Sequence, residues 1–383
     1  MSIKRSTRVL ALAGSLAALP FMLPGVAAAD PAIAPVDLGT LPGDLFSEVN
    51  AINDHGVMVG SSTPLEPQIK HHATRWDAQG RITALAGLGG EQSEANDVNE
   101  HGVAVGWAHK DPARNQTAVK WAPDGAVTAL PSLPGGDYAY ANEISGTGVV
   151  VGTGNGADGK AHALRWNADG TVVALGDLDG DYGSALWITR DGRTIGGTAT
   201  DAAGRNHAVR WNSEGVITDL SPGIADSTPE DMNDNGVIVG SARLSGDPKP
   251  VRWEQDGRTT WLEHPEIWPA WASAVNDAGV AAGGGYQVFG TTNPARWDGT
   301  GARTTLSTER GLGNDIDSAG TVVGLENEIA AKWDASGTRT VLGALPGGTY
   351  SNATHIAANG VIAGISYNEE GRSHAVYWPN TQG

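Results

Sequence analysis

Carboxylates recur at one position of a sequence unit that is repeated along this chain, and carboxylates held close together can do acid/base chemistry. They are Asp97, Glu143, Asp231 and Asp315, each in the first predicted strand of its unit. The other four units carry Ala51, Trp187, Ala274 and His355 at this position. Carboxylates that share a site raise one another's pKa values and attract cations or basic groups. We expect the four to line a central channel, either as a functional site or as the wall of a hydrated channel without a ligand.

A second acidic feature is a loop in which three carboxylates alternate with other residues: Asp177, Asp179 and Asp181. Oxygen ligands at this spacing suit calcium, although the twelve-residue loop with a terminal glutamate that typifies calcium-binding hands is absent. Calcium is therefore the one candidate cofactor that the sequence offers, and we expect no other.

Aromatic residues that depart from the repeat form the third candidate site. They occupy strand ends and links that we place at one end of the repeated units. We select Trp107, Trp187, Trp268, Trp271, Tyr138, Tyr140 and Tyr182. Tyr and Trp rings offer flat apolar area with a polar handle, which suits a sugar chain. The alternative is that these rings only plug the funnel or pack the longer links.

Linear motifs of enzymes are missing. The sequence has no Gly-x-Ser-x-Gly elbow, no phosphate-binding glycine loop and no His-Glu-x-x-His, and it contains no cysteine. We therefore favour a non-catalytic protein. A fold made of repeated units can assemble a site from several of them, so the missing motifs do not exclude an enzyme.

The elements that must position these residues come from a repeat marked by tryptophan. Eight tryptophans follow one another at intervals of 36 to 45 residues: Trp76, Trp121, Trp166, Trp211, Trp253, Trp297, Trp333 and Trp378. A period of this size indicates stacked supersecondary units, none of which can bury its apolar faces alone. We expect the eight tryptophans to pack between units.

Each unit reads as four short strands. In the first, they are residues 48–53, 57–60, 72–76 and 82–85, with a glycine-containing turn at 54–56. Short β-branched runs between glycine-rich turns predict antiparallel hairpins. Four strands per unit are the plan of a propeller blade. We predict an all-β fold, a β-propeller of eight four-stranded blades, with repeats at about 37–85, 86–130, 131–175, 176–220, 221–262, 263–306, 307–342 and 343–378.

Closure of the ring is predicted from the two ends of the repeat. The eighth unit stops at Trp378 and has no fourth strand, whereas residues 34–39 resemble a fourth strand that precedes the first unit. We expect this N-terminal strand to complete the last blade and remove an exposed edge. The recurring His72, His162, His207 and His374 then lie one per blade around the ring, which favours a structural role over a converging metal site.

The residues that recur in each repeat resemble those of the extracellular HAF repeat family of bacteria. The resemblance rests on His-Ala-x-x-Trp, on Leu-Gly-x-Leu-x-Gly-Gly and on Ile-Asn-x-x-Gly-x-Val-Val-Gly, and it covers residues 36–378. It departs in the later units, where His-Ala becomes Lys249-Pro250, Asn293-Pro294 and Ile329-Ala330. It implies an exported repeat protein and carries over no catalytic residue.

The N-terminal residues and the net charge of the chain indicate where the protein is located and which partners it binds. Residues 1–29 read as a signal peptide, with Lys4, Arg5 and Arg8 before an apolar stretch and Ala27-Ala28-Ala29 as the cleavage site. We expect residues 30–383 to be one secreted domain, a monomer that does not insert into a membrane. The net charge of −18 disfavours nucleic acid as a partner.

Three functions stay open at this stage. The first is a secreted binding protein that recognises extracellular polysaccharide through the aromatic residues. The second is a polysaccharide hydrolase or lyase that uses the channel carboxylates. The third is a scaffold that binds a surface protein of the cell or its matrix. A fold does not decide among them.

Overall fold

The computed structural model describes residues 32–65, 70–110, 115–224, 226–264, 269–286 and 292–380. In this part of the chain all regular elements are β-strands, which confirms the predicted all-β class. The described residues contain no helix with the length and apolar character that a membrane crossing requires. The predicted signal peptide and Trp268 lie outside the described residues.

The strands follow one another in units of four. The first three units are β2 (Phe46–Ile52), β3 (Met58–Thr63), β4 (His72–Trp76) and β5 (Ile82–Ala84); β6 (Gly89–Val98), β7 (Ala104–Lys110), β8 (Gln116–Trp121) and β9 (Val127–Ala129); and β10 (Ala139–Ile144), β11 (Val150–Asn155), β12 (Ala161–Trp166) and β13 (Val172–Ala174). The next two are β14 (Asp179–Ile188), β15 (Ile195–Asp201), β16 (Asn206–Trp211) and β17 (Ile217–Asp219); and β18 (Asp226–Met232), β19 (Ile238–Arg243), β20 (Lys249–Trp253) and β21 (Thr259–Trp261).

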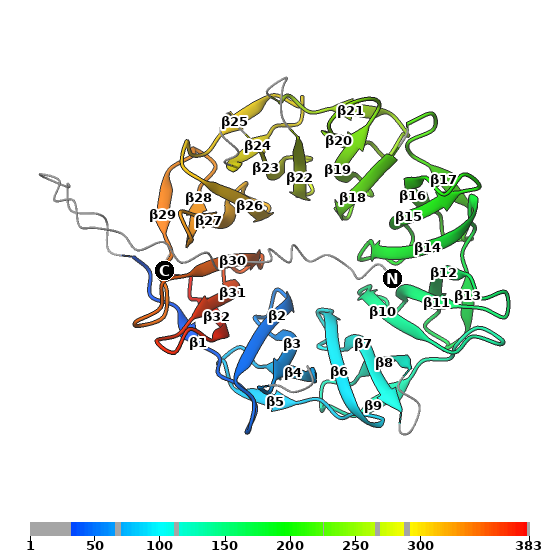
Figure 1. Cartoon of the computed structure of the whole chain (residues 1–383), viewed down its shortest axis with the longest axis horizontal. Coiled ribbons are helices and arrows are strands. Elements are labelled where there is room, and N and C mark those ends of the chain that lie inside the picture. Colours follow the sequence, from blue (N-terminus) through cyan, green and yellow to red (C-terminus); the bar gives the residue numbers. More distant parts are fainter. Residues whose placement is uncertain are drawn as a thin grey trace, which may run out of the picture.

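The remaining strands follow the same order. They are β22 (Ala270–Val275), β23 (Ala281–Tyr286), β24 (Thr292–Trp297) and β25 (Arg303–Thr305); β26 (Gly311–Ile316), β27 (Val322–Glu326), β28 (Ile329–Trp333) and β29 (Arg339–Val341); and β30 (Ser351–Ile356), β31 (Ile362–Tyr367) and β32 (Ser373–Trp378). Strands within a unit pair antiparallel in chain order. Figure 1 shows the units arranged around a centre, with the first strand of each unit innermost.

The N-terminal strand β1 (Val36–Asp37) supplies the outer strand of the last unit. Val36 lies opposite Tyr377 and Asp37 opposite Val376, which gives the sheet order β1-β32-β31-β30. The hydroxyl of Ser47 in β2 donates to the carbonyl of Gly39 at 2.7 Å and accepts the N–H of Ala375 at 2.9 Å. The first unit is therefore hydrogen-bonded to the last.

A β-bulge interrupts the first strand of all eight units at one register position. In β2 it lies between Val49 and Ala51, and in β10 between Ala141 and Glu143. The same irregularity occurs in β6, β14, β18, β22, β26 and β30. A bulge adds an unpaired residue and re-aims the side chains that follow it. In four units the extra residue is an asparagine that donates to the next unit: Asn50 to Ala95, Asn96 to Ala141, Asn142 to Ala185 and Asn314 to Ala353.

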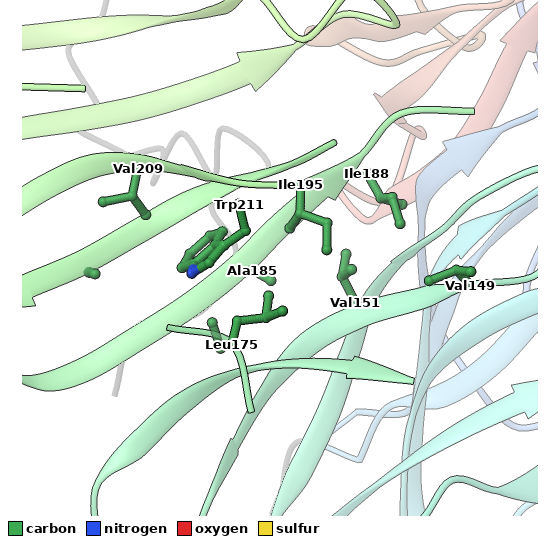
Figure 2. Close-up of a cluster of buried hydrophobic side chains, with 10 residues drawn as sticks. Val149, Val151, Leu175, Ala185, Ile188, Ile195, Val209 and Trp211 are labelled. Atoms are coloured by element: carbon green, nitrogen blue, oxygen red, sulfur yellow. The ribbon is translucent and has the colours of Figure 1, made fainter. Parts of the chain in front are cut away.

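The core lies between neighbouring units, and the repeated tryptophans are its largest members. All eight indoles are at most 1% exposed. Figure 2 shows one junction, where Trp211 and Ile195 of the fourth unit pack with Leu175 and Val151 of the third. Six indole N–H groups also donate to a carbonyl at 2.6 to 3.1 Å, and the acceptors are Leu38, Ala86, Pro131, Gly176, Glu263 and Gly343. The repeated tryptophan thus fills one core position in every unit, and in six of the eight it also supplies a hydrogen-bond donor.

The repeated histidines each face an aspartate. The pairs are His72 with Asp44 at 2.8 Å, His162 with Asp158 at 3.0 Å, His207 with Asp219 at 3.1 Å and His374 with Asp37 at 2.9 Å. The described residues hold no group of three or more His, Cys, Asp and Glu side chains that could bind a metal ion. The expected structural role of these histidines fits this arrangement.

Candidate functional site

Three of the selected aromatic residues converge at the junction of the third and fourth units. Tyr138 immediately precedes β10, Tyr140 lies in β10 and Tyr182 lies in β14. The hydroxyl of Tyr140 shares hydrogen bonds with Thr153 and Tyr182. Burial, with the nearby Tyr182, raises the pKa values of both Tyr138 and Tyr140 above their usual range. We call Tyr138, Tyr140 and Tyr182 the tyrosine cluster.

Strand register explains why these residues meet. Tyr140 pairs with Thr153 of β11, and the Thr153 hydroxyl lies 2.6 Å from that of Ser184 in β14. Tyr182 forms a parallel bridge with Ala161 of β12, which joins the two units into one eight-stranded sheet. Gly183 permits this approach, since a Cβ there would lie 3.2 Å from the backbone nitrogen of Ala163. The two units are thus closer here than a shared core alone requires.

Polar groups surround the tyrosine cluster. The Asn155 side chain accepts the N–H groups of Asp137 and Tyr138 at 2.9 and 3.0 Å and donates to the Asp137 carboxylate at 2.7 Å. Lys160 donates to the carbonyl of Gly180 at 3.1 Å and pairs with Asp181 at 3.0 Å. The cluster therefore offers half-buried rings beside fixed amide, carboxylate and ammonium groups.

The predicted calcium loop borders this cluster but does not form a ligand set. Asp177 accepts the N–H of Asp179 at 3.0 Å, which closes a local turn in which Asp179 has a positive φ of 66°. Asp181 is 87% exposed at its side chain and pairs with Lys160. Among the described residues, no three acidic or histidine side chains meet as a metal group. A calcium site at Asp177, Asp179 and Asp181 therefore stays a prediction that this arrangement does not support.

The selected tryptophans do not all lie at the same register position of their units. Trp271 in β22 pairs with Gly284 as Tyr140 pairs with Thr153, so it lies at the level of the tyrosine cluster in the sixth unit. Trp107 pairs with Glu94 at that level too, but it is only 8% exposed and packs against His109 at a ring separation of 5.1 Å. We call the tyrosine cluster together with Trp271 the aromatic face.

Trp187 lies at the register position of the channel carboxylates. It follows the bulge of β14 and pairs with Gly196, which is the position that Glu143 holds in β10, as the alignment of the units indicated. The bulge separates it from the end where Tyr182 lies, so it does not join the tyrosine cluster. Trp268 falls outside the described residues.

The four channel carboxylates each bond to the backbone of the following unit. Asp97 accepts the N–H of Ile144 at 2.9 Å and Glu143 that of Ile188 at 2.7 Å. Asp231 accepts from Val275 and Asp315 from Ile356, both at 2.8 Å. These acceptors satisfy backbone donors beside the bulge of the neighbouring strand, so the carboxylates link inner strands in sequence around the ring.

Asp315 has a strongly raised pKa. Burial raises its pKa to about 7 against the opposing effect of the Ile356 hydrogen bond, and the charge of Asp231 adds to the rise. The charge of Asp231 therefore acts on Asp315, while both carboxylates accept backbone hydrogen bonds from the following unit.

A second pair of rings lies outside the selected set, and one of its members, Tyr350, falls in a link that corresponds to those of Tyr138 and Tyr182. Tyr350 and Tyr367 lie in the last unit with ring centroids 5.0 Å apart. Burial and the carboxylate of Glu328 raise the pKa of Tyr350 to about 12. Glu328 itself pairs with Arg310 at 3.3 Å. Tyr367 is the last residue of the second strand of its unit. An aromatic residue at the end of that predicted strand could have identified this pair from the sequence.

Comparisons with known proteins give a fold and no family. Neither a protein-family model nor a curated protein matches the chain. Dipeptidyl peptidase 4 from Porphyromonas gingivalis is 12% identical at a TM-score of 0.54, over 89% of this chain and 60% of that one. The β-propeller domain of the Trilobed protease from Pyrococcus furiosus is 10% identical at a TM-score of 0.52, over 78% of this chain and 98% of that domain. TolB from Acinetobacter baumannii is 17% identical at a TM-score of 0.40, over 60% of this chain.

The likeness to the propeller domain of the Trilobed protease confirms a β-propeller scaffold. This chain spans 57% of the length of TolB and 60% of that of the dipeptidyl peptidase. At such low identity the likeness shows the architecture alone, and the activities of those proteins do not transfer with it.

Proposed function

We propose that this chain is a secreted, non-catalytic β-propeller that binds extracellular polysaccharide through the aromatic face. The observation that carries the proposal is the convergence of Tyr138, Tyr140 and Tyr182 from two adjacent units. Tyrosine rings offer flat area to the apolar face of a sugar ring, and their hydroxyls offer hydrogen bonds. Asn155, Asp137 and Lys160 supply the few polar groups that orient a ligand in such a site.

The proposal includes a complete ring. We infer that the eight units are eight blades and that β1 closes the ring as the outer strand of the last blade. The pairing of β1 with β32 and the hydrogen bonds of Ser47 support this inference. A further support is the Asp54 carboxylate of the first unit, which accepts the N–H of Ala358 in the last at 2.9 Å.

Membership of the HAF repeat family and secretion through the 1–29 leader belong to the same proposal. An exported chain without cysteine gains its stability from a large core rather than from disulfides. The eight buried indoles supply that core.

The enzyme hypothesis has one observation in its favour. Asp315 has a pKa near 7, which suits a general acid, and it interacts with the charge of Asp231. Against this, each channel carboxylate already accepts a backbone N–H of the next unit. Their positions are therefore explained by the assembly of the ring, and we favour the binding protein.

Retention of residues 30–383 on a panel of soluble and insoluble glycans tests the proposal. We expect retention that Tyr138→Ala and Tyr182→Ala abolish and that Trp261→Ala leaves intact. Trp261 is a matched control because it is 37% exposed and ends the outer strand β21. Release of reducing or unsaturated sugars from a retained glycan, lost in Asp231→Asn, would instead establish the enzyme.

A further inference from the structure

The second pair of tyrosines lies across the centre of the molecule from the tyrosine cluster. Tyr350 immediately precedes β30 of the last unit, as Tyr138 immediately precedes β10 of the third. Tyr367 is the last residue of β31, as Asn155 is the last residue of β11. Figure 1 shows β10 and β14 on the opposite side of the centre from β30 and β31. The two groups of tyrosines therefore lie at the same end of their units, on opposite sides of the centre.

The two rings of this pair differ in exposure. Tyr350 is only 8% exposed, whereas Tyr367 is half-buried, and their ring centroids lie 5.0 Å apart. The backbone holds the two residues side by side, because the N–H of Tyr367 donates to the carbonyl of Tyr350 at 2.9 Å. Tyr350 thus supports the ring that Tyr367 presents to solvent.

A charged pair borders these rings. Arg310 and Glu328 lie 3.3 Å apart, with side chains 67% and 50% exposed. Burial raises the pKa of Tyr350 to about 12, and the charges of Glu328 and Arg310 also act on it, so the pair lies close to this hydroxyl. A guanidinium presents several N–H donors in one plane, and a carboxylate presents acceptors. Together they can bond to neighbouring hydroxyls of a sugar beside an aromatic ring.

The turn that carries Glu328 has an uncommon backbone conformation. Asn327 and Glu328 have φ values of 49° and 69°, between the paired residues Glu326 and Ile329. A two-residue turn of this kind requires positive φ at both positions, which glycine and asparagine adopt far more readily than glutamate. The N–H of Ser351 donates to the carbonyl of Glu328 at 2.9 Å and fixes the turn to the start of β30. Such conformations cluster at ligand-binding positions, where neighbouring contacts enforce them.

We propose that Tyr367, supported by Tyr350, forms a second sugar subsite with Arg310 and Glu328, and that one polysaccharide chain reaches from it to the tyrosine cluster. This inference rests on the proposed function. Tyr367 offers flat area to the apolar face of a sugar ring, and the charged pair orients its hydroxyls. Linking two subsites through one ligand makes the second contact intramolecular, so a long chain binds more tightly than a short one.

Equilibrium dialysis of residues 30–383 tests the inference. The probes are the soluble polysaccharide that the chain retains on the glycan panel and a trisaccharide cut from it. We expect two trisaccharides to bind per protein molecule, and the polysaccharide to bind about a hundredfold more tightly than the trisaccharide. Tyr367→Ala should bind one trisaccharide and lose about tenfold or more of its affinity for the polysaccharide.

A second variant guards against loss of packing at Tyr367. Glu328→Gly removes the carboxylate at a position whose φ of 69° suits glycine, so the fold is kept. It should also weaken the polysaccharide. Trp261→Ala is the control and should bind like wild type, since Trp261 ends the outer strand β21. All variants must unfold near the wild-type temperature.

The outcomes separate this inference from the proposed function. One trisaccharide per wild-type molecule, or wild-type affinity for the polysaccharide in both Tyr367→Ala and Glu328→Gly, would overturn the second subsite. The proposed function would still stand if Tyr138→Ala and Tyr182→Ala abolished retention. Failure of the wild-type chain to retain any glycan would overturn both.

Discussion

Arg190 of the fourth unit lies 3.4 Å from Asp54 of the first, and it thereby joins two units that are not neighbours in the chain. The same guanidinium lies 3.4 Å from Asp234 of the fifth unit. Asp54 in turn accepts the N–H of Ala358 in the last unit. All four residues occupy the turn after the first strand of their units. The turns at this end of the ring are thus linked by a charged network across the centre.

Arg190→Ala should lower the free energy of unfolding only slightly. The Arg190 and Asp54 side chains are 61% and 32% exposed, and exposed ion pairs contribute about 0–1 kcal/mol. The loss should fade at high sodium chloride, because salt screens exposed charges. Urea unfolding at low and high salt measures it. Arg193→Ala in the same turn is the control, since Arg193 is 81% exposed and lies 3.8 Å from Asp191 of its own turn. An equal, salt-sensitive loss in Arg193→Ala would contradict the cross-ring role.

The ion pair of Asp37 and His374 should make the attachment of the N-terminal strand dependent on pH. Although burial opposes it, the hydrogen bonds from His374 and the Gly39 N–H lower the pKa of Asp37, while the hydrogen bond to Asp37 raises the pKa of His374. Because the pKa of Asp37 is lowered in the folded state, its carboxylate stabilises the fold, and this stabilisation is lost as the pH falls through the folded-state pKa. The raised imidazole pKa contributes stability that is complete below about 6.5 and lost as pH rises through the folded value.

The contribution of this ion pair to the thermal unfolding midpoint should therefore be greatest between about pH 4 and 6.5. His374→Gln should remove the decline on the alkaline side of that window. His162→Gln is the control, because His162 pairs with Asp158 inside the third unit at 3.0 Å and does not touch the N-terminal strand. The same flattening in both variants would show that the N-terminal attachment is not the cause.

Two repeated tryptophans should differ in what their indole N–H contributes. Trp166 donates to the carbonyl of Pro131 at 2.7 Å, whereas the indole nitrogen of Trp333 is buried with no hydrogen-bond partner among the described residues. Trp166→Phe should cost about 1 kcal/mol more in unfolding free energy than Trp333→Phe, since it also removes a hydrogen bond. Both side chains are at most 1% exposed, so their packing losses are comparable. Chemical denaturation of the two variants measures the difference, and a greater cost at Trp333 would contradict the argument.

Asp315 should make the folded chain less stable as pH rises from about 4 to about 7. Burial raises its pKa to about 7, so in that interval the folded state binds a proton that the unfolded state has released. Asp315→Asn removes this titration, and its stability relative to wild type should rise across the window. Urea unfolding at several pH values gives the difference, and carbon NMR of the carboxyl gives the pKa. A difference that is constant with pH, or a carboxyl pKa near 4, would contradict it.

The architecture was predictable because each unit solves the same packing problem with the same residues. The repeated Trp76 and its equivalents fix one core position per junction, and the glycine turns fix the hairpins. Gly56, for example, has a φ of 78° that other residues rarely adopt. The missing fourth strand after Trp378 identified the partner of β1, since an unpaired sheet edge is unfavourable.

The candidate site was predictable only in part, because it depends on register rather than on residue type. The sequence placed Tyr138, Tyr140 and Tyr182 in corresponding links, and two adjacent units then brought them together. It placed Trp187 both among the aromatic residues and at the position of Glu143, and only strand pairing shows the bulge that separates this residue from Tyr182. Nor could it show that Asp97 and its equivalents bond to the next unit, because that contact joins residues more than forty positions apart.

Calorimetric titration of the glycan that residues 30–383 retain tests the central claim most directly. We predict saturable binding that falls by about tenfold or more in the Tyr138→Ala, Tyr182→Ala double variant, as expected for the loss of two stacking rings. Trp261→Ala should bind like wild type, and all three proteins should unfold at similar temperatures. Failure to retain any glycan, or an equal affinity in the double variant and wild type, would contradict the assignment of the aromatic face as a polysaccharide-binding site.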